Sequence, residues 1–170
     1  MPGEAAATRH WGMGTLVRST VLGLAVGGRT STAFAVPVMV GTRGRTGVGP
    51  ALLRLLARAA VVGELVGDKL PSTPSRTDEP VLYGRTAAGA LGALALSVLE
   101  RRRVGSHLVA LVAGGAGAFV GSIAGREWRR WADEEGPEGL HPDWKAAVME
   151  DALVLVGAAC LVGTSRDPRF

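Results

Sequence analysis

Apolar runs of membrane-crossing length alternate with short charged segments along this chain. Helices of about 20 apolar residues span a ~30 Å hydrocarbon core, and the pattern predicts such helices. They cover roughly Thr15–Val40, Pro50–Lys69, Val81–Leu99, Leu108–Gly125 and Ala146–Gly163. The clearest is Leu108–Gly125, which lies within 22 residues that carry no formal charge and is followed by Trp128 and Trp131. Because tryptophans mark membrane–water interfaces, this run is expected to cross the bilayer.

The predicted fold is an all-α membrane bundle of four to five transmembrane helices, built from two tandem helical hairpins and a C-terminal helix. Residues 15–164 would form this single domain, between a flexible N-terminus (1–14) and a short tail (165–170). The run Pro50–Lys69 carries Arg54 and Arg58 on one helix face, so it either spans the bilayer or lies in its interface.

The first apolar run permits two interpretations. Ala33-Phe34-Ala35 resembles the cleavage site of a secretory signal peptide, with Arg18 in its charged N-terminal region. However, Arg29 interrupts the apolar run, and apolar sequence continues to Val40. These two features favour a first membrane helix that carries Arg29 near its middle.

The composition supports a membrane protein and disfavours nucleic acid as a partner. Apolar residues make up 47% of the 170 residues, the mean hydropathy is +0.24, and the net charge is +4, with Arg supplying 17 of the 19 basic residues. These basic residues flank apolar runs instead of forming a basic helix with interleaved aromatics, which disfavours nucleic-acid binding. The Arg-rich, Lys-poor usage indicates a bacterial chain, and the expected location is the bacterial cytoplasmic (inner) membrane.

The chain carries no recognisable catalytic or metal-binding pattern. Cys160 is its only cysteine, which excludes an intrachain disulfide and a cysteine metal cluster, and its three histidines are scattered. Nucleotide-binding fingerprints, a G-x-S-x-G elbow and an H-E-x-x-H motif are absent from the sequence. We therefore expect no cofactor and no metal. A membrane-embedded lipid-modifying enzyme is the least favoured function, because no nucleophile–base pair or metal pair is visible in the sequence.

Two segments, 28–69 and 84–127, share a layout that suggests an internal repeat. Gly28-Arg29-Thr30 recurs 56 residues later as Gly84-Arg85-Thr86, and Val48-Gly49 recurs at the same offset as Val104-Gly105. Chance similarity between Ala-, Gly- and Arg-rich segments is the alternative explanation. If the duplication is real, each segment forms a two-helix hairpin, and repeats of this kind often hold a substrate or ion site between them.

The hairpins also predict an orientation in the membrane. The turns with Arg43 and Arg45, and with Arg101–Arg103, would both lie on one side, and the loops with most of the acidic residues on the other. The positive-inside rule then places the hairpin turns and the C-terminus in the cytoplasm.

Charged residues in or beside the apolar runs form the candidate ligand- or ion-binding site. They are Arg29, Glu64, Asp68, Lys69, Arg76, Arg85 and Glu150. An ionised side chain inside a bilayer costs from a few to more than ~10 kcal/mol, so such groups are expected to face the bundle interior and to pair. We expect Arg29 and Arg85 to form ion pairs with the acidic residues. These are Glu64, Asp68, Glu150 and the adjacent Asp151.

Two functions fit this site. In the first, the protein transports or binds an anionic lipid, a small anion or an ion, and its basic residues engage the anionic group. In the second, it is a structural or scaffolding membrane protein whose buried charges only fix helix packing. Membrane lipids, including anionic ones, are the expected partners.

A row of glycines offers a surface for close helix packing. Gly117, Gly121 and Gly125 are four residues apart, and small residues at this spacing let helices approach closely in a bilayer. The contact would form either within the chain or between the subunits of a homo-oligomer.

Several motifs together resemble the bacterial membrane-protein family known as domain of unknown function four-one-two-six. They are Gly28-Arg29-Thr30-Ser31, the segment GELVGDKLPSTPSRT from Gly63 to Thr77, and Gly84-Arg85. The family pattern has a proline where this chain has Ala33. The resemblance covers roughly residues 15–164 and implies a small integral membrane protein, but it implies no activity.

Overall fold

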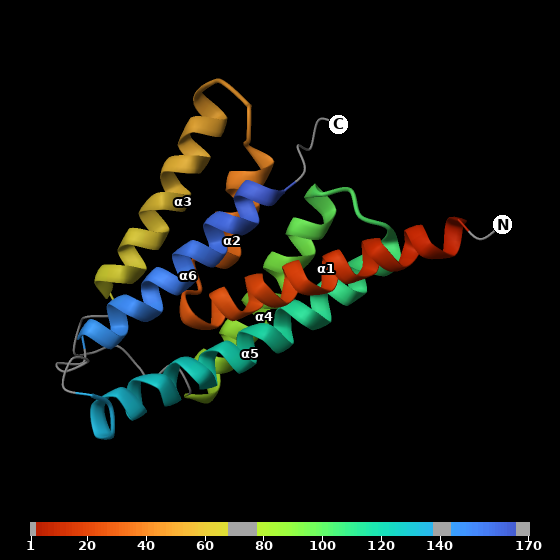
Figure 1. Cartoon of the computed structure of the whole chain (residues 1–170). Helices are drawn as coiled ribbons and strands as arrows, with labels where there is room; N and C mark the ends of the chain where they lie inside the picture. The colour runs from red at the N-terminus through yellow and green to blue at the C-terminus, as the bar shows by residue number, and fades with distance from the viewer. Residues whose placement is uncertain (1–2, 68–77, 138–143, 166–170) are drawn as a thin grey trace.

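The computed structural model describes residues 3–67, 78–137 and 144–165, with side chains from Gly14 onward. This part of the chain contains six α-helices and no strand (Figure 1). They are α1 (Gly3–Gly28), α2 (Thr32–Gly41), α3 (Val48–Gly67), α4 (Glu79–Leu99), α5 (Val104–Glu134) and α6 (Trp144–Thr164). The all-α class predicted from the hydropathy pattern is therefore confirmed.

Three of these helices, α4, α5 and α6, are long and apolar enough to cross a membrane. They contain the predicted runs Val81–Leu99, Leu108–Gly125 and Ala146–Gly163. The helix predicted over Pro50–Lys69 also forms, as α3, but it is not among the candidate spans of the described residues. The structure thus supports three membrane-spanning helices by length and composition, and the count of four to five is not confirmed.

The single helix predicted over Thr15–Val40 is wrong. Helix α1 ends at Gly28, the chain turns through Arg29–Ser31, and α2 runs back beside α4. The consecutive glycines Gly27 and Gly28 lower helix propensity at this point. Two other helices supply side chains that satisfy the backbone at the break, so the interruption does not leave polar groups in an apolar interior. Arg29 therefore lies at a turn between helices rather than in the middle of one.

The helix boundaries differ from the expected ones at two further places. Helix α1 begins at Gly3, within the N-terminal segment expected to be flexible, and α5 continues through Glu134 into the segment expected to be a loop. In the extension of α5, the exposed Arg130 forms ion pairs with Glu127 and Glu134, three and four residues away. Pairs at these spacings stabilise a helix that leaves the apolar region.

Small residues let the central helices approach closely. A Cβ added at Gly117 of α5 would lie 2.7 Å from the carbonyl oxygen of Thr20 on α1, and one at Gly121 would lie 2.6 Å from that of Leu24. A Cβ at Gly89 of α4 would lie 2.6 Å from the carbonyl oxygen of Gly114. This part of the glycine row packs against α1 of the same chain, and an oligomer through it stays a prediction.

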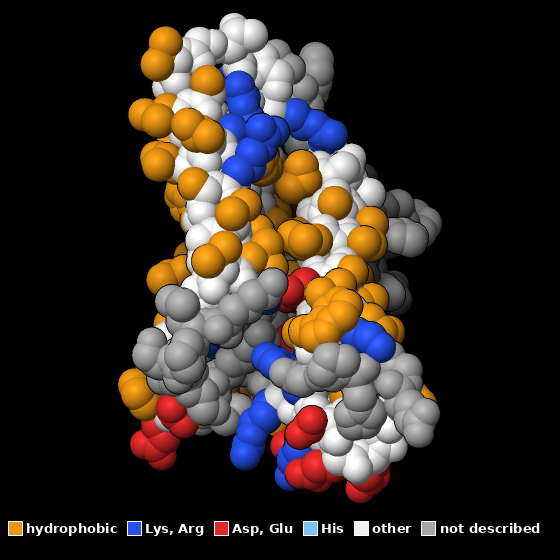
Figure 2. Space-filling view, turned by 90° about the vertical axis from the view of Figure 1, so that its left-hand side faces the viewer, with side chains coloured by type: hydrophobic (Ala, Val, Ile, Leu, Met, Phe, Trp, Pro, Cys, Tyr) orange, Lys and Arg blue, Asp and Glu red, His pale blue; other side chains and the backbone are white. Residues whose placement is uncertain are grey.

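Apolar side chains lie both inside the bundle and over its outer surface. The core gathers around Leu22 and Val26 of α1, with α6 against α1 and α3 at the edge of the bundle (Figure 1). Large apolar side chains are exposed along α3, α5 and α6, such as Leu55, Leu108 and Leu153, and Figure 2 shows hydrophobic atoms over much of one face. An apolar surface of this extent suits contact with lipid.

Successive helices run in alternating directions, so charged residues collect at two levels of the bundle. One level holds the α1–α2 break and the beginnings of α4 and α6, and the other holds the end of α4 and the end of α6. Arg85 and Glu100 mark the two levels on α4, and the rise of an α-helix separates them by ~22 Å.

The members of the predicted repeat differ locally, since Arg29 is in a turn and Arg85 is inside α4, and the duplication stays a prediction.

Candidate functional site

Glu64 binds the backbone where α2 begins. Its Oε1 accepts the N–H of Thr30 and its Oε2 accepts the N–H of Ser31, each at 2.8 Å. Glu64 is in the last turn of α3, so a carboxylate from one helix satisfies two amide donors that precede another. The N-terminal end of a helix carries unsatisfied donors and a partial positive charge, and it therefore favours an anion.

Arg85 binds the other side of the same break. Its Nη1 donates to the carbonyl oxygens of Gly27 at 2.9 Å and Gly28 at 3.3 Å, which end α1. Its Nη2 lies 3.7 Å from Oε1 of Glu64, and their side chains are 8% and 16% exposed. A cation at the C-terminal end of α1 and an anion at the N-terminal end of α2 both match the helix dipoles.

Arg29 connects this break to α6. Its Nε and Nη2 both donate to Oδ1 of Asp151, the first at 2.9 Å, and its Nη1 donates to the carbonyl oxygen of Glu64 at 3.3 Å. The Arg29 side chain is only 4% exposed. We call Arg29, Glu64, Arg85, Glu150 and Asp151 the Arg29 cluster.

Glu150 lies beside an apolar cavity at the edge of this cluster. A cavity of about 460 Å³ opens between α1, α5 and α6, and its lining includes Gly28, Trp128 and Glu150. Glu150 is buried, and a Cβ added at Gly28 would lie 3.6 Å from its Oε1. Glu150 is thus the charged group between the polar cluster and the apolar cavity.

The structure brings four of the predicted site residues together, namely Arg29, Glu64, Arg85 and Glu150, along with Asp151. The other three, Asp68, Lys69 and Arg76, lie outside the described residues. Among the side chains that the structure describes, no group of three His, Cys, Asp or Glu residues is placed to hold a metal ion.

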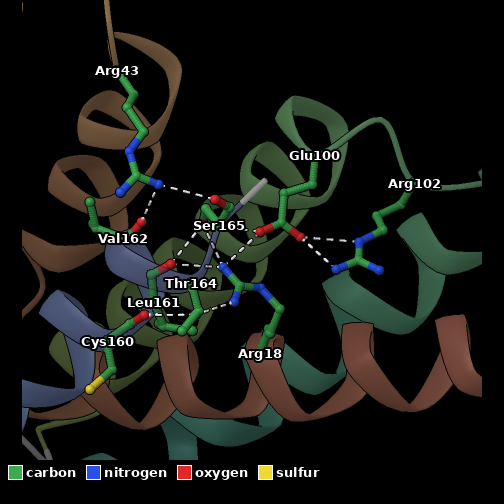
Figure 3. A network of polar contacts seen from close by, with 9 residues as sticks. All are labelled: Arg18, Arg43, Glu100, Arg102, Cys160, Leu161, Val162, Thr164 and Ser165. Atoms are coloured by element: carbon green, nitrogen blue, oxygen red, sulfur yellow. Dashed lines mark hydrogen bonds and ion pairs between the residues drawn. The ribbon is translucent and has the colours of Figure 1, made fainter. Parts of the chain in front are cut away.

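A second polar network lies at the opposite level and was not predicted (Figure 3). The carboxylate of Glu100, 3% exposed, accepts hydrogen bonds from Arg102, and its Oε1 lies 2.7 Å from Nη2 of Arg18. The hydroxyl of Ser165 donates toward the same Oε1 at 3.1 Å. We call Arg18, Glu100, Arg102 and Ser165 the Glu100 cluster, and it joins α1 to the ends of α4 and α6.

The sequence contained a signal for this network. Arg18 is a lone charge within an apolar stretch, as Arg29 is, and Glu100 is the one acidic residue beside the Arg101–Arg103 turn. Interpreting Arg18 as part of a charged N-terminal region hid its need for a buried partner. Pairing each lone charge of an apolar run with the nearest opposite charge at the same level would have linked Arg18 to Glu100.

Arginines of this chain repeatedly donate to the carbonyl oxygens that end other helices. Arg18 binds the carbonyl oxygen of Leu161, and Arg43 binds those of Val162 and Ser165 near the end of α6. Arg54 of α3 binds the carbonyl oxygen of Thr42, just after α2, at 2.9 Å. These contacts add hydrogen-bond donors at helix ends, where the regular intrahelical N–H donors run out.

The structure is an all-α bundle with polar clusters at two levels, and the length and composition of its three apolar helices indicate a membrane protein. No family model matches the chain, and no curated protein or solved structure matches it. The resemblance to domain of unknown function four-one-two-six therefore stays a prediction that rests on the motifs quoted above.

Proposed function

We propose that the protein is a small multi-pass protein of the bacterial inner membrane that binds, and carries across the bilayer, a molecule with an anionic group. The carboxylate of Glu64 supports this proposal, because it occupies a position that suits an external anion. Two backbone N–H groups hold it at 2.8 Å, and Arg85 is 3.7 Å away. Helix ends that bind charged groups are a recurring feature of the substrate sites of membrane carriers.

An incoming carboxylate or phosphate would replace Glu64 at the helix break. The ionised carboxylate of Glu64 would repel an incoming anion, because both would occupy the same position beside the amides of Thr30 and Ser31. If Glu64 takes up a proton as it leaves, the charge of the cluster is unchanged when the anion enters. The proposal therefore couples anion binding to proton uptake, and anion affinity should rise as the pH falls.

The test compares anion retention by the detergent-purified protein in native mass spectrometry. The probes are inorganic phosphate, acetate and phosphatidylglycerol, each at pH 7 and pH 5. The wild type should retain one of these probes more strongly at pH 5, and Arg85→Ala should lose it. Arg103→Ala removes an exposed arginine and is the matched control.

A second variant keeps the test informative if Arg85→Ala does not fold. Glu64→Gln imitates a protonated Glu64, so it should bind the anion at pH 7 without acidification. Bare protein in every sample, including Glu64→Gln, would refute the anion site.

The second candidate is a structural membrane protein whose charges only fix packing. The internal pairing of Arg29 with Asp151, and the arginine contacts to helix-ending carbonyls, favour it specifically. It predicts less stable variants without any retained anion, which the same spectra would show. Both candidate functions are proposed with the hairpin turns in the cytoplasm.

A further inference from the structure

Helix α3 carries arginines on an exposed surface that is otherwise apolar. Arg54 and Arg58 are four residues apart, so they lie on the same face of α3. Arg58 is exposed, and its neighbours on the helix surface, Leu55 and Val62, are 62% and 57% exposed. Helix α3 packs against α2 at the edge of the bundle, which leaves this surface open to lipid (Figure 1).

Arg54 marks the place where α3 meets the charged end of the bundle. Its Nη1 donates to the carbonyl oxygens of Thr42 at 2.9 Å and Arg45 at 3.2 Å, in the turn between α2 and α3. Arg43, in the same turn, donates to carbonyl oxygens near the end of α6. The guanidinium of Arg54 therefore lies at the level of the Glu100 cluster, which joins α1 to the ends of α4 and α6.

Arg58 is attached one helical turn deeper than Arg54, and its side chain is long enough to rise to the same level. Four residues of an α-helix span ~6 Å along the axis. A long arginine side chain bridges such a distance by directing its guanidinium toward the membrane–water interface. A guanidinium that stayed in the hydrocarbon would be unfavourable. We therefore expect the two guanidinium groups to lie together at interface depth, beside the apolar surface of α3.

The charges around these arginines are complementary to an anion. The sequence contains no aspartate or glutamate from Ala5 to Gly63, and the carbonyl oxygens that hold Arg54 carry no formal charge. The carboxylate of Glu100, at the same level, is already bound by Arg18 and Arg102. Guanidinium groups donate paired hydrogen bonds to phosphate. A phosphate group that approaches α3 from the lipid therefore fits this surface.

We propose that this surface of α3 binds one anionic phospholipid, with its phosphate between Arg54 and Arg58 and an acyl chain along Val62 and Val66. Val66 is 62% exposed and follows Val62 by one helical turn, toward the middle of the bilayer. The site lies at the opposite level from the anion position at the helix break. It can therefore succeed or fail independently of the proposed anion transport.

The test measures lipid affinity by native mass spectrometry of the detergent-purified protein at pH 7. Dioleoylphosphatidylglycerol is compared with dioleoylphosphatidylcholine, which has the same phosphate and acyl chains but no net charge. The wild type should bind the phosphatidylglycerol at least about tenfold more tightly, because two guanidinium groups attract its net charge. Glycerophosphoglycerol, the same head group without chains, and inorganic phosphate should not be retained, because they lack the chains that contact α3.

Substitutions of the two arginines examine the head group site. Arg58→Gln removes an exposed guanidinium and should reduce the preference for phosphatidylglycerol at least about threefold, and the double variant Arg54→Gln/Arg58→Gln should remove it. Arg58→Lys keeps the charge but not the paired donors, so it should keep part of the preference. Arg103→Gln, at an exposed arginine beside the start of α5, is the matched control and should keep all of it.

Any of three results would overturn the proposal. They are equal affinity of the wild type for the two lipids, an unchanged preference in Arg58→Gln, and retention of inorganic phosphate or glycerophosphoglycerol as strongly as the lipid. Loss of phosphatidylglycerol from Arg85→Ala, but not from Arg58→Gln, would assign the lipid to the helix break instead. The comparison of probes on the wild type needs no variant, so the proposal can be rejected even if the double variant does not fold.

Discussion

Arg85 and Glu64 bind the two sides of one helix break, and their charged groups lie 3.7 Å apart. Arg85 donates to the carbonyl oxygens that end α1, and Glu64 accepts the N–H groups that precede α2. Backbone polar groups in an apolar interior must find partners. This ion pair supplies them, so the break in the first helix depends on residues from α3 and α4.

Replacing Arg85 with Ala should strongly destabilise the protein. It leaves the carbonyls of Gly27 and Gly28 without this donor and removes the guanidinium that lies 3.7 Å from the Glu64 carboxylate, and breaking a buried pair costs ~3–5 kcal/mol. The unfolding midpoint of the detergent-purified protein, followed by tryptophan fluorescence, measures the loss. Arg103→Ala, at an exposed position, should change stability by no more than ~0.5 kcal/mol. Equal midpoints for the two variants would contradict the capping role of Arg85.

The effects of Arg85 and Glu64 should not be additive. The double variant Arg85→Ala/Glu64→Ala should be more stable than the sum of the single losses implies, because each single variant leaves the other charge buried. The expected coupling is ~0.5–3 kcal/mol, obtained from the unfolding free energies of the four proteins in a double-mutant cycle. A coupling near zero would mean that the two side chains cap the break independently.

The sequence predicted the helices better than it predicted the path between them. Apolar runs identified α4, α5 and α6 because their hydropathy stays high even where a few charges interrupt them, and Leu108–Gly125 in α5 carries no charge at all. The break at Arg29 could not be placed from local sequence, since its stability comes from Glu64 and Arg85, distant in the chain. The pairing of Arg29 and Arg85 with acids that include Glu64 and Asp151 was predicted and is confirmed, but which acid each arginine meets depends on how the helices pack.

Replacing Glu100 with Gln should loosen the end of α6. The carboxylate of Glu100 pairs with Arg18 and Arg102 and accepts from Ser165, so its loss leaves two guanidinium groups without their anion. Removing one partner of such a buried network costs ~3–5 kcal/mol. Hydrogen–deuterium exchange should increase near Leu161–Ser165. The exposed Glu135→Gln is the control, and unchanged exchange in Glu100→Gln would refute the connection to α6.

Two Gly-to-Ala substitutions should have opposite effects on stability. At Gly117 a Cβ would lie 2.7 Å from the carbonyl oxygen of Thr20, and forcing α5 away from α1 costs ~1–3 kcal/mol. At Gly84, in α4, no atom lies within 4 Å of the added Cβ, so the higher helix propensity of Ala should stabilise by up to ~1 kcal/mol. Unfolding midpoints in detergent distinguish the two, and a stabilised Gly117→Ala would show that α1 and α5 do not pack closely there.

The two hairpin turns should be accessible from the same side of the membrane. Arg43 contacts the end of α6, and Arg102 is joined to that end through Glu100 and Ser165, so both turns lie at one level of the bundle. Figure 2 shows one group of Lys and Arg near the top of its view and others in its lower half, where most Asp and Glu also lie. The positive-inside rule then assigns the turns to the cytoplasm.

Cysteine labelling in inverted and right-side-out vesicles tests this orientation. Single cysteines at Thr46 and Arg103, and one at Asp133 of α5, would be introduced after replacing Cys160, and all three positions are exposed. A membrane-impermeant thiol reagent should label Thr46→Cys and Arg103→Cys from the cytoplasmic side and Asp133→Cys from the other. Labelling of Thr46→Cys and Arg103→Cys from opposite sides would contradict the arrangement of the helices itself. Labelling of both from the external side would preserve that arrangement and reverse its orientation, so the shallow excess of arginine at this end would not govern insertion.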